Sequence, residues 1–382
     1  MRRSVLLAAV GAAVLAAAAG ALAGPPPDVE ARSVLVGNGA TGLVLHAERQ
    51  AEQTAIASIT KIMTALVVLE RAGPDEVVRV EGPAPTVGES SIGLRAGERL
   101  PVRDLLTAML VYSANDAAYA LAYHVGKGSV GRFVSLMNAK AEELGLEDTH
   151  FSRPDGLDAP GNYSSARDVF RLARVAMRKP LFRELVRIRR TAVAGRVVQN
   201  RNDLLFSYPG TIGVKTGHTS DAGWSEVVAA RRDGVTIYAV LLGGPSRAQR
   251  NADLARLLDW GFDQYRRVSL VKPGRTYAEA LVPFSDRRLA LVAQAPVIAV
   301  AQLGRPLVER VVATAMVDLP VAKGEELGEI RILDGAKVIA TRPLVAAESI
   351  GEPSVGQRLR WYAGRALDHA GDAFGSLFGL IS

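Results

Sequence analysis

The order of secondary-structure patterns along this chain restricts its fold more than any other feature. Helical patterns prevail between residues 56 and 178. Three β-rich stretches then follow one another, at residues 211–216, 224–230 and 235–242. Arg232-Asp233-Gly234, between the last two, is typical of a hairpin turn. A helical pattern at residues 247–265 comes next. This order predicts an α+β fold, in which helices flank an antiparallel sheet.

The first half of the chain refines this expectation. Two strand patterns, at residues 31–37 and 42–46, are joined by the turn Asn38-Gly39. Helix patterns follow at residues 56–71, 103–125, 131–144 and 165–178. The second of these breaks near Ser113 into two helical stretches. Residues 197–208 show no regular pattern and are expected to be irregular.

The pattern changes again near residue 271. From there to residue 344, short Val, Ile and Leu runs alternate with Gly, Pro and Asp turns, which predicts a small all-β domain. Helical composition returns at the C-terminus. The predicted organisation is a leader at 1–23, a mixed domain at 24–266, a β domain at 271–345 and an amphipathic helix at 354–382.

The N-terminus predicts an export signal. Arg2 and Arg3 precede an uncharged, mostly apolar run at residues 5–22, and Ala21-Leu22-Ala23 has the small-x-small form of a cleavage site. Cleavage there would place the remaining chain outside the cytoplasm. The alternative is an uncleaved membrane anchor, since the run is close to the shortest that can span a bilayer.

Composition excludes several kinds of site. The chain has no cysteine, so disulfides, thiolate nucleophiles and cysteine-bound zinc are excluded. Its five histidines are scattered, and we expect neither a metal nor a cofactor. The net charge of +7 is spread along the chain without interleaved aromatic residues, which argues against nucleic-acid binding.

Three short motifs carry the chemistry. Ser58-Ile-Thr-Lys61 lies where a helix pattern begins, Ser113-Ala-Asn115 lies at the break between helices, and Lys215-Thr-Gly217 lies within a strand pattern. Each motif alone is a weak signal, because short combinations of this kind arise by chance. All three in this order and in these structural contexts indicate nucleophilic catalysis by a serine with a lysine base.

The spacing of the first motif explains why a lysine can act as the base. Residues three apart lie on one face of a helix, so Lys61 can reach the Ser58 hydroxyl. A helix N-terminus also stabilises negative charge that develops near Ser58. Lys61 becomes a base only if its pKa is lowered, which burial and a second cation such as Lys215 can do.

The other two motifs supply the partners of this pair. Ser113 can relay a proton to the leaving amine, and the Asn115 amide can orient the substrate or the lysine. Lys215 and Thr216 can bind a free carboxylate. Gly217 leaves room for a substrate strand beside this edge. The N–H groups of Ser58 and His218 can form an oxyanion hole.

With these residues the chain resembles the D-alanyl-D-alanine carboxypeptidases, low-molecular-mass penicillin-binding proteins with a serine β-lactamase-like fold. The resemblance extends over about residues 31–262 and includes the segments 57–66, 110–118, 200–205 and 210–219. It implies that Ser58 is acylated when the terminal D-alanine leaves a peptidoglycan pentapeptide, and that β-lactams occupy the same serine. It also implies an extracytoplasmic location on the periplasmic or cell-wall side. Two positions depart from the residues common in the family. Arg153, before a Pro-x-Gly-Leu run, stands where asparagine is usual, and Trp224, after Ala-Gly, stands where a smaller or less bulky residue is common.

Other readings of the motifs stay open. A β-lactamase shares all three but typically adds a glutamate in an E-x-x-x-N loop, and no glutamate between the second and third motifs has asparagine four residues later. The motifs do not distinguish a carboxypeptidase from a cell-wall endopeptidase or transpeptidase. A non-catalytic wall-binding or membrane-binding protein that retained the fold predicts damage to a motif, and all three are intact.

The C-terminal segment at 354–382 has two readings. It mixes arginines and aspartates with aromatic and aliphatic residues, so it is too polar to span a bilayer. It is suited to lie on a membrane surface with its aromatic residues inserted, as the resemblance also implies. The alternative is a helix packed on the β domain.

Overall fold

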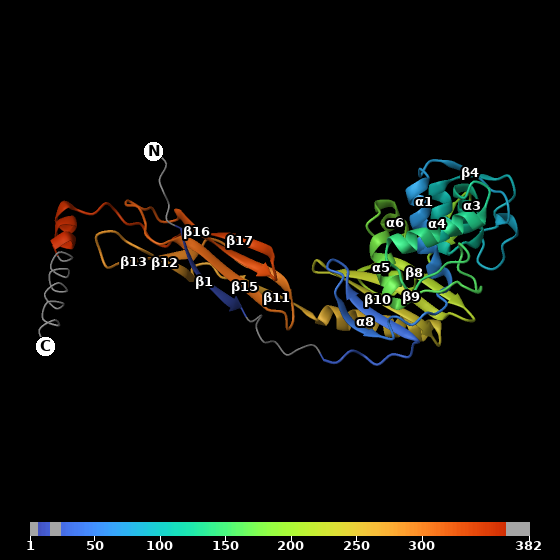
Figure 1. Cartoon of the computed structure of the whole chain (residues 1–382), viewed down its shortest axis with the longest axis horizontal. Coiled ribbons are helices and arrows are strands. Elements are labelled where there is room, and N and C mark those ends of the chain that lie inside the picture. Colours follow the sequence, from blue (N-terminus) through green and yellow to red (C-terminus); the bar gives the residue numbers. More distant parts are fainter. Residues whose placement is uncertain (1–6, 16–23, 364–382) are drawn as a thin grey trace, which may run out of the picture. The chain divides into compact units, whose positions relative to one another are not determined.

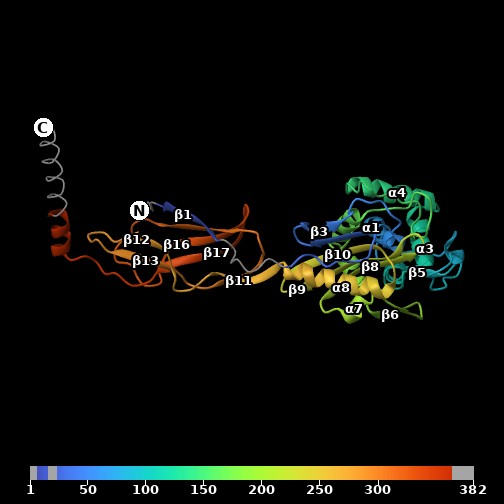
Figure 2. The same ribbon diagram turned by 90° about the horizontal axis from the view of Figure 1, so that it is seen from below.

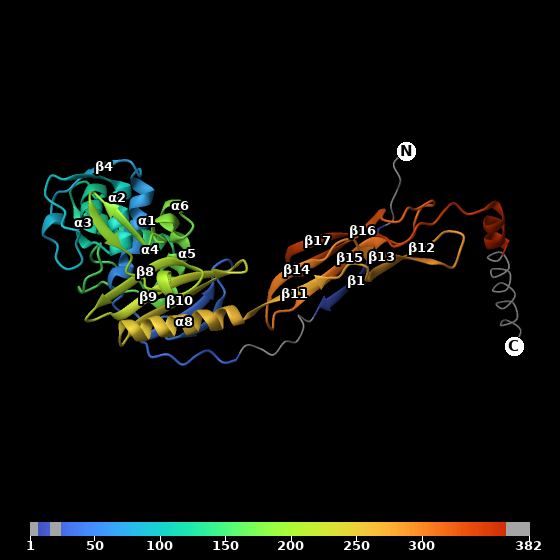
Figure 3. The same cartoon turned by 180° about the vertical axis from the view of Figure 1, so that it is seen from behind.

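The computed structural model describes residues 7–15 and 24–363 and divides the chain into two compact units. The mixed unit comprises residues 23–264 and contains the helices and one five-stranded sheet. The β unit comprises residues 1–22 and 265–382. Figures 1, 2 and 3 show the elements of each unit from three sides. The α+β fold predicted from the order of the patterns is confirmed.

The sheet of the mixed unit joins the first strands of the unit to its last ones. Its order is β3-β2-β10-β9-β8, and every neighbouring pair is antiparallel. The strands are β2 (Ser33–Asn38), β3 (Val44–Glu48), β8 (Thr211–Thr219), β9 (Gly223–Arg232) and β10 (Val235–Gly244). The three β-rich stretches predicted from the sequence are therefore consecutive antiparallel neighbours at one side of the sheet, with β8 as the edge strand.

Helices cover both faces of this sheet. The helices of the mixed unit are α1 (Lys61–Arg71), α2 (Val102–Thr107), α3 (Asn115–Val125), α4 (Val130–Glu143), α5 (Ala166–Ala176), α6 (Pro180–Leu185), α7 (Leu204–Ser207) and α8 (Arg247–Asp263). Phe170 of α5 contacts Tyr238 with ring centroids 5.7 Å apart, whereas Gly261 of α8 lies against Ile237. Consecutive strand residues point to opposite faces, so α5 and α8 pack on opposite sides of β10.

Helix α1 lies inside the helical part of the mixed unit. Residues 61–68 are all buried, and α1 packs against α3, α4 and α5. The short turn η1 (Ala57–Thr60) precedes α1, and the π-helical turn η3 (Ala108–Tyr112) follows α2. A helix surrounded on all sides carries its first residues, including Lys61, into the core.

The structure also contains short elements that the sequence patterns did not predict. Two hairpins pair β4 (Val77–Arg79) with β5 (Arg99–Pro101) and β6 (Arg190–Val193) with β7 (Arg196–Gln199), and η2 spans Ala84–Thr86. The expectation that residues 197–208 are irregular is wrong, because β7 and α7 fall within that segment. Strands and helices of three or four residues are too short to show a period.

The β unit consists of antiparallel strands. Its six-stranded sheet has the order β1-β15-β16-β17-β13-β12, and β11 pairs with β14. The strands are β1 (Leu7–Leu15), β11 (Tyr265–Val271), β12 (Thr276–Leu281), β13 (Arg288–Ala293), β14 (Val297–Gln302), β15 (Leu307–Thr314), β16 (Glu326–Asp334) and β17 (Lys337–Ala346). The predicted start at residue 271 is late, since β11 already begins at Tyr265.

The structure describes only part of the leader and of the C-terminal segment. Residues 7–15 of the predicted leader form β1 and pair with β15, while the predicted cleavage site at 21–23 lies outside the described residues. Residues 355–363 are helical, and the rest of the predicted amphipathic helix lies outside the described residues. No helix in the described ranges has the length and hydrophobicity needed to cross a membrane.

Candidate active site

Ser58 and Lys61 meet where η1 passes into α1. The Lys61 ammonium donates a hydrogen bond of 2.7 Å to the Ser58 hydroxyl, as their spacing predicts. Ser58 lies within η1, so the helical turn before α1, and not α1 itself, presents the serine. Lys61 is completely buried. The pair therefore has the contact that a serine nucleophile and its base require.

Two further acceptors surround the Lys61 amine. It donates 2.8 Å to the Asn115 side-chain oxygen and 2.6 Å to the backbone carbonyl of Asp155. The pKa of Lys61 is lowered to about 8, mainly by burial; Asp155 acts in the opposite direction, and the cation of Arg153 adds to the lowering. A substantial fraction of Lys61 is thus neutral near physiological pH.

Ser113 occupies the break between η3 and α3. Its backbone is left-handed, with φ of 70°, and this ends one helix and starts the next. Lys215 of β8 donates 3.0 Å to the Ser113 hydroxyl and 2.9 Å to the Thr216 carbonyl. Burial, and then repulsion from Lys61, hold the pKa of Lys215 well below its ordinary value. The third motif is thereby joined to the second by a direct contact.

Gly217 lies where β8 passes η1. A Cβ atom at this position would lie 2.6 Å from the Ile56 carbonyl oxygen and 3.2 Å from the Ser58 nitrogen. The sequence suggested that glycine makes room for a substrate, but the space is filled by the backbone that carries Ser58. Glycine is required here because the two backbones approach so closely.

These motifs surround a cleft of about 230 Å³. Its lining consists of Ser58, Glu89, Ser90, Ser113, Arg201, Thr216, Gly217, His218, Trp224, Arg247 and Arg250. Five of the eight residues predicted from the motifs therefore line the cleft, and Lys61, Asn115 and Lys215 are buried beside it. Within residues 24–363 the structure contains no cluster of three or more potential metal ligands.

Sequence patterns indicated a loop at residues 82–97 but not that it contributes Glu89 and Ser90 to the cleft. Asn115 holds this loop through its side-chain donation of 3.1 Å to the Gly88 carbonyl. The buried Asp116 carboxylate accepts hydrogen bonds from the Ser91 hydroxyl at 2.6 Å and the Leu94 N–H at 3.0 Å. An Asp directly after the S-x-N motif, at the start of α3, was the signal available for this role.

The structure also gives contacts for Trp224 and Arg153, the two residues that depart from those common in the family that the chain resembles. Trp224 lies opposite His218 on β9, and their rings stack with centroids 3.9 Å apart. The Arg153 guanidinium donates 2.7 and 3.1 Å to the two carboxylate oxygens of Asp155. Arg153 thus neutralises the residue whose backbone carbonyl binds Lys61.

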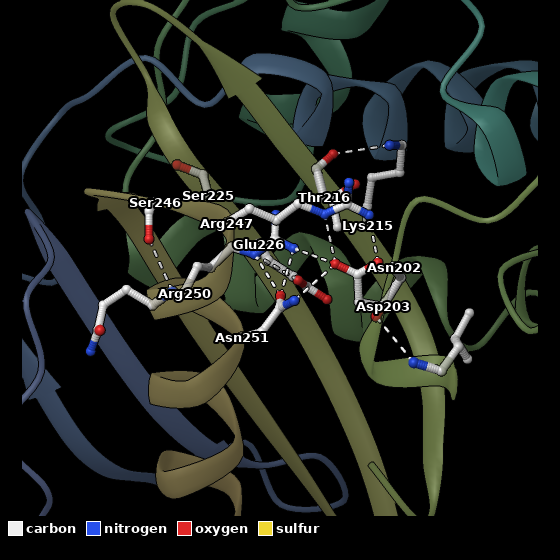
Figure 4. A network of polar contacts seen from close by, with 12 residues as sticks. Asn202, Asp203, Lys215, Thr216, Ser225, Glu226, Ser246, Arg247, Arg250 and Asn251 are labelled. Carbon is white, nitrogen blue, oxygen red and sulfur yellow. Dashed lines mark hydrogen bonds and ion pairs between the residues drawn. The ribbon is translucent and has the colours of Figure 1, made fainter. Parts of the chain in front are cut away.

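A polar network lies next to the cleft between β8, β9 and α8 (Figure 4). Glu226 of β9 is fully buried, and the Nε of Arg250 lies 3.1 Å from one of its oxygens. Asp203 accepts 2.7 Å from Arg247 and 2.8 Å from Asn251. The sequence analysis did not single out any of these residues, because they belong to none of the three motifs.

Comparison with known proteins gives a consistent result for most of the chain. A family model described as D-alanyl-D-alanine carboxypeptidase (Peptidase_S11) matches residues 20–246. The D-alanyl-D-alanine carboxypeptidase DacD of Salmonella typhimurium is 34% identical over 365 residues, covering 91% of this chain and 93% of that protein. The D-alanyl-D-alanine carboxypeptidase of Streptomyces sp. K15 is 34% identical and covers 64% of this chain and 94% of its own length.

Solved structures match both units. The penicillin-binding protein 6B from Escherichia coli has 31% identity and a TM-score of 0.62, covering 85% of this chain and 97% of its own. The Streptomyces K15 DD-transpeptidase has 33% identity and a TM-score of 0.59, covering 63% of this chain and 99% of its own. The match to the second structure covers about the same fraction of this chain as the mixed unit does.

Proposed function

The chain belongs to the S11 family of D-alanyl-D-alanine carboxypeptidases, and from this membership we propose how its own residues carry out the reaction. The protein is a serine-type, penicillin-binding peptidase that acts on peptidoglycan and works through an acyl-enzyme. We propose Ser58 as the acylated residue. The observation that supports this assignment most directly is the 2.7 Å hydrogen bond between Ser58 and a fully buried lysine.

Acylation begins with neutral Lys61. It takes the proton of the Ser58 hydroxyl as the oxygen attacks the carbonyl carbon of the penultimate D-alanine. The resulting oxyanion accepts hydrogen bonds from the backbone N–H groups of Ser58 and His218. When this intermediate collapses, the C–N bond breaks, Ser113 passes a proton to the leaving amine and takes one from protonated Lys61, and Lys61 is neutral again. Terminal D-alanine departs, and an ester on Ser58 remains.

Substrate recognition uses the other wall of the cleft. Thr216 and Lys215 bind the free carboxylate that marks the end of the peptide. Asn115 orients the lysine base through its side-chain oxygen. Deacylation repeats the chemistry with water: Lys61 takes a proton from the water as it attacks the ester carbon, the acyl C–O bond to Ser58 breaks, and Lys61 returns the proton to the Ser58 oxygen.

The decisive experiment compares the protein with its Ser58→Ala variant. Each is incubated with benzylpenicillin and then with diacetyl-L-Lys-D-Ala-D-Ala, while intact mass and D-alanine release are measured. We expect a stable penicilloyl adduct and D-alanine release that both vanish in the variant. Rapid penicillin turnover without a lasting adduct would favour a β-lactamase instead. Neither adduct nor release would favour a non-catalytic binding protein.

A second activity, transfer of the acyl group to an amine, has one observation in its favour. The solved Streptomyces K15 relative is named a DD-transpeptidase. An amine that enters the cleft in place of water would give a new peptide bond from the same acyl-enzyme. Adding a D-amino acid acceptor to the assay and separating exchanged from hydrolysed peptide distinguishes the two reactions, and an endopeptidase would cleave a cross-linked dimer peptide.

We propose that the chain is exported through a signal at residues 1–23 and acts on the outer side of the cytoplasmic membrane. The positive start, apolar run and small-x-small site support export. Removal of this leader would also remove β1 and leave β15 at the edge of the sheet. The N-terminal sequence of the protein recovered from its host tests this, with Gly24 expected as the first residue.

Attachment to the membrane surface through 354–382 is a separate proposal. In the described part of this segment Val355, Leu359 and Tyr362 are exposed apolar side chains. The alternative, packing on the β unit, has its own support because Phe284 contacts the rings of Trp361 and Tyr362 at 5.5 and 5.9 Å. Deleting residues from Ser354 onward should release the protein from membranes and keep its activity on soluble peptide. Continued sedimentation with membranes would contradict the proposal.

A further inference from the structure

The carboxylate of Glu226 is buried beside the cleft and has no part in the steps described above. Glu226 lies directly opposite Thr216 in the antiparallel pair of β9 and β8. Opposed residues of such a pair point to the same face, so Glu226 shares a face with a residue that lines the cleft. A fully buried carboxylate is costly unless a cation compensates it, so its presence calls for a functional explanation.

The compensating cation is Arg250 of α8. Its Nε lies 3.1 Å from a Glu226 oxygen, and Arg250 is one of the residues that line the cleft although only 2% of it is exposed. The same guanidinium donates 3.1 and 2.7 Å to the side-chain oxygen of Asn251. Within the described chain neither Glu226 oxygen accepts a hydrogen bond, so Glu226 holds Arg250 through its charge.

A second anion competes for this guanidinium. Asp203 lies 3.8 Å from Arg250 and also binds Arg247, so the arginine is placed between two carboxylates (Figure 4). If Glu226 lost its charge, Asp203 would attract the guanidinium away from the β8–β9 side of the cleft. The position of Arg250 therefore depends on the ionisation of Glu226.

We propose that Glu226 is a positioning residue that holds the Arg250 guanidinium on the Thr216 side of the cleft, where it binds the free carboxylate of the substrate. This inference rests on the proposed carboxypeptidase function and deepens it. Glu226 touches neither Ser58 nor Lys61, so its loss weakens substrate binding and leaves the chemical steps intact. The expected signature is a change in KM without a matching change in kcat.

The pH response gives an independent signature. Burial raises the pKa of Glu226 to about 7, against the lowering influence of Arg250. Three other charges also contribute to this value: Asp203, ahead of α7, acts in the same direction as burial, whereas Lys215 of β8 and Arg247 of α8 act against it. Glu226 is ionised above about pH 7, and substrate binding therefore weakens as the pH falls through that value.

The test measures steady-state D-alanine release from diacetyl-L-Lys-D-Ala-D-Ala between pH 6 and pH 9. We expect Glu226→Gln to raise KM about tenfold at pH 8 while kcat changes by less than about twofold. The wild-type KM should rise below about pH 7, and this rise should be absent from the variant. Glu309→Gln is the matched control, since Glu309 is a buried glutamate of the β unit whose pKa burial also raises.

A double-mutant cycle shows whether Glu226 acts through Arg250. Arg250→Gln, Glu226→Gln and the double variant should share one raised KM. An unchanged KM in Glu226→Gln, or a further rise in the double variant, overturns the proposal. Should Glu226→Gln fail to fold, the wild-type profile decides, and a KM that stays flat between pH 6 and pH 8 overturns it.

A ligand without a terminal carboxylate separates positioning from general damage. A peptide boronic acid reacts with the serine but lacks that carboxylate, so wild type and Glu226→Gln should bind it equally. Weaker binding of this ligand by a folded variant would make Glu226 a structural residue and overturn the proposal. Failure of the proposed function looks different, because the wild type itself would then release no D-alanine and form no penicilloyl adduct.

Discussion

The mixed unit and the β unit differ in what they bury. In the described part of the β unit the core is aliphatic, and Glu309 is its buried charged residue. The mixed unit buries charges of both signs at Lys61, Asp116, Lys140, Asp155, Asp168, Lys215, Glu226, Arg250 and Asp253. Burying a charge is expensive, so a concentration of such residues in one unit marks where the protein has exchanged stability for chemistry.

The buried lysines of the mixed unit differ in their hydrogen-bond partners and therefore in the direction of their pKa shifts. Burial lowers the pKa of Lys61 and Lys215, which have hydroxyl, amide or carbonyl acceptors as partners. Burial acts in the same direction on Lys140, but its hydrogen bonds to Glu143 and Glu70 outweigh burial and raise the pKa. The neutral partners of Lys61 leave it suited to act as a base, whereas Lys140, with carboxylate partners, is a structural cation.

Replacing these two kinds of lysine gives the largest contrast. Lys61→Met should slow acylation by benzylpenicillin at least about 10³-fold, because Ser58 loses the base that accepts its proton. Lys140→Met should leave the acylation rate within about twofold and lower the free energy of unfolding by about 1 kcal/mol, since Glu70 and the exposed Glu143 lose a partner. The acylation rate is measured by intact mass, and unfolding by urea titration.

The same contrast extends to pH. In the wild type kcat/KM should fall as the pH drops below about 8, since protonated Lys61 cannot accept the serine proton. The loss should approach tenfold per pH unit. Equal acylation rates for both lysine variants, or a rate independent of pH between 6 and 8, would contradict the distinction between the two lysines.

The effect of a methyl group at Gly217 is expected to be smaller. Gly217→Ala places Cβ against the Ile56 carbonyl and the Ser58 nitrogen, so β8 and η1 must separate. Misplacement of the nucleophile relative to the oxyanion donors should reduce acylation about 100-fold. Gly73→Ala is the control, because a Cβ there meets no atom within 4 Å. A Gly217→Ala variant with normal acylation would show that the close approach is not needed for catalysis.

The sequence predicted the parts of the site that share a motif. Ser58 and Lys61 lie one helical turn apart, so local geometry alone brings them together. The break at Ser113 was also visible, since two helix patterns meet there, whereas its left-handed backbone was not. The contact of Lys215 with Ser113 was not predicted, because spacing says nothing about residues that are distant along the chain.

Other parts of the site depend on tertiary contacts that leave no local pattern. The Asp155 carbonyl binds Lys61 through its backbone, which any residue supplies. Glu226 appears in the sequence as one acidic residue in a strand, and its pairing with Arg250 requires the packing of α8 on β9. Short hairpins such as β6–β7 were missed for a related reason, since four residues give no measurable alternation.

Arg153 offers a test with a smaller expected effect. Arg153→Asn removes the cation that neutralises Asp155, so the pKa of Lys61 should rise above about 8. Fewer molecules then carry the neutral base at pH 7, and kcat/KM there should fall about threefold and recover at pH 9. Arg103→Asn, which breaks an exposed ion pair with Glu184, should leave the profile unchanged. A loss that is equal at both pH values would indicate misplacement of the Asp155 carbonyl instead.

The β unit should respond to mutation in stability and not in catalysis. Ile330 of β16 is fully buried in the aliphatic core, so Ile330→Ala should lower the free energy of unfolding of this unit by about 3 kcal/mol. Val338→Ala on β17, which is 45% exposed, should change it by less than about 0.5 kcal/mol. Both variants should release D-alanine from soluble peptide at the wild-type rate. Their unfolding is measured by calorimetry. A parallel loss of activity in Ile330→Ala would show that catalysis depends on the β unit, and the division between a unit that buries charge for chemistry and one whose core is mainly aliphatic would then fail.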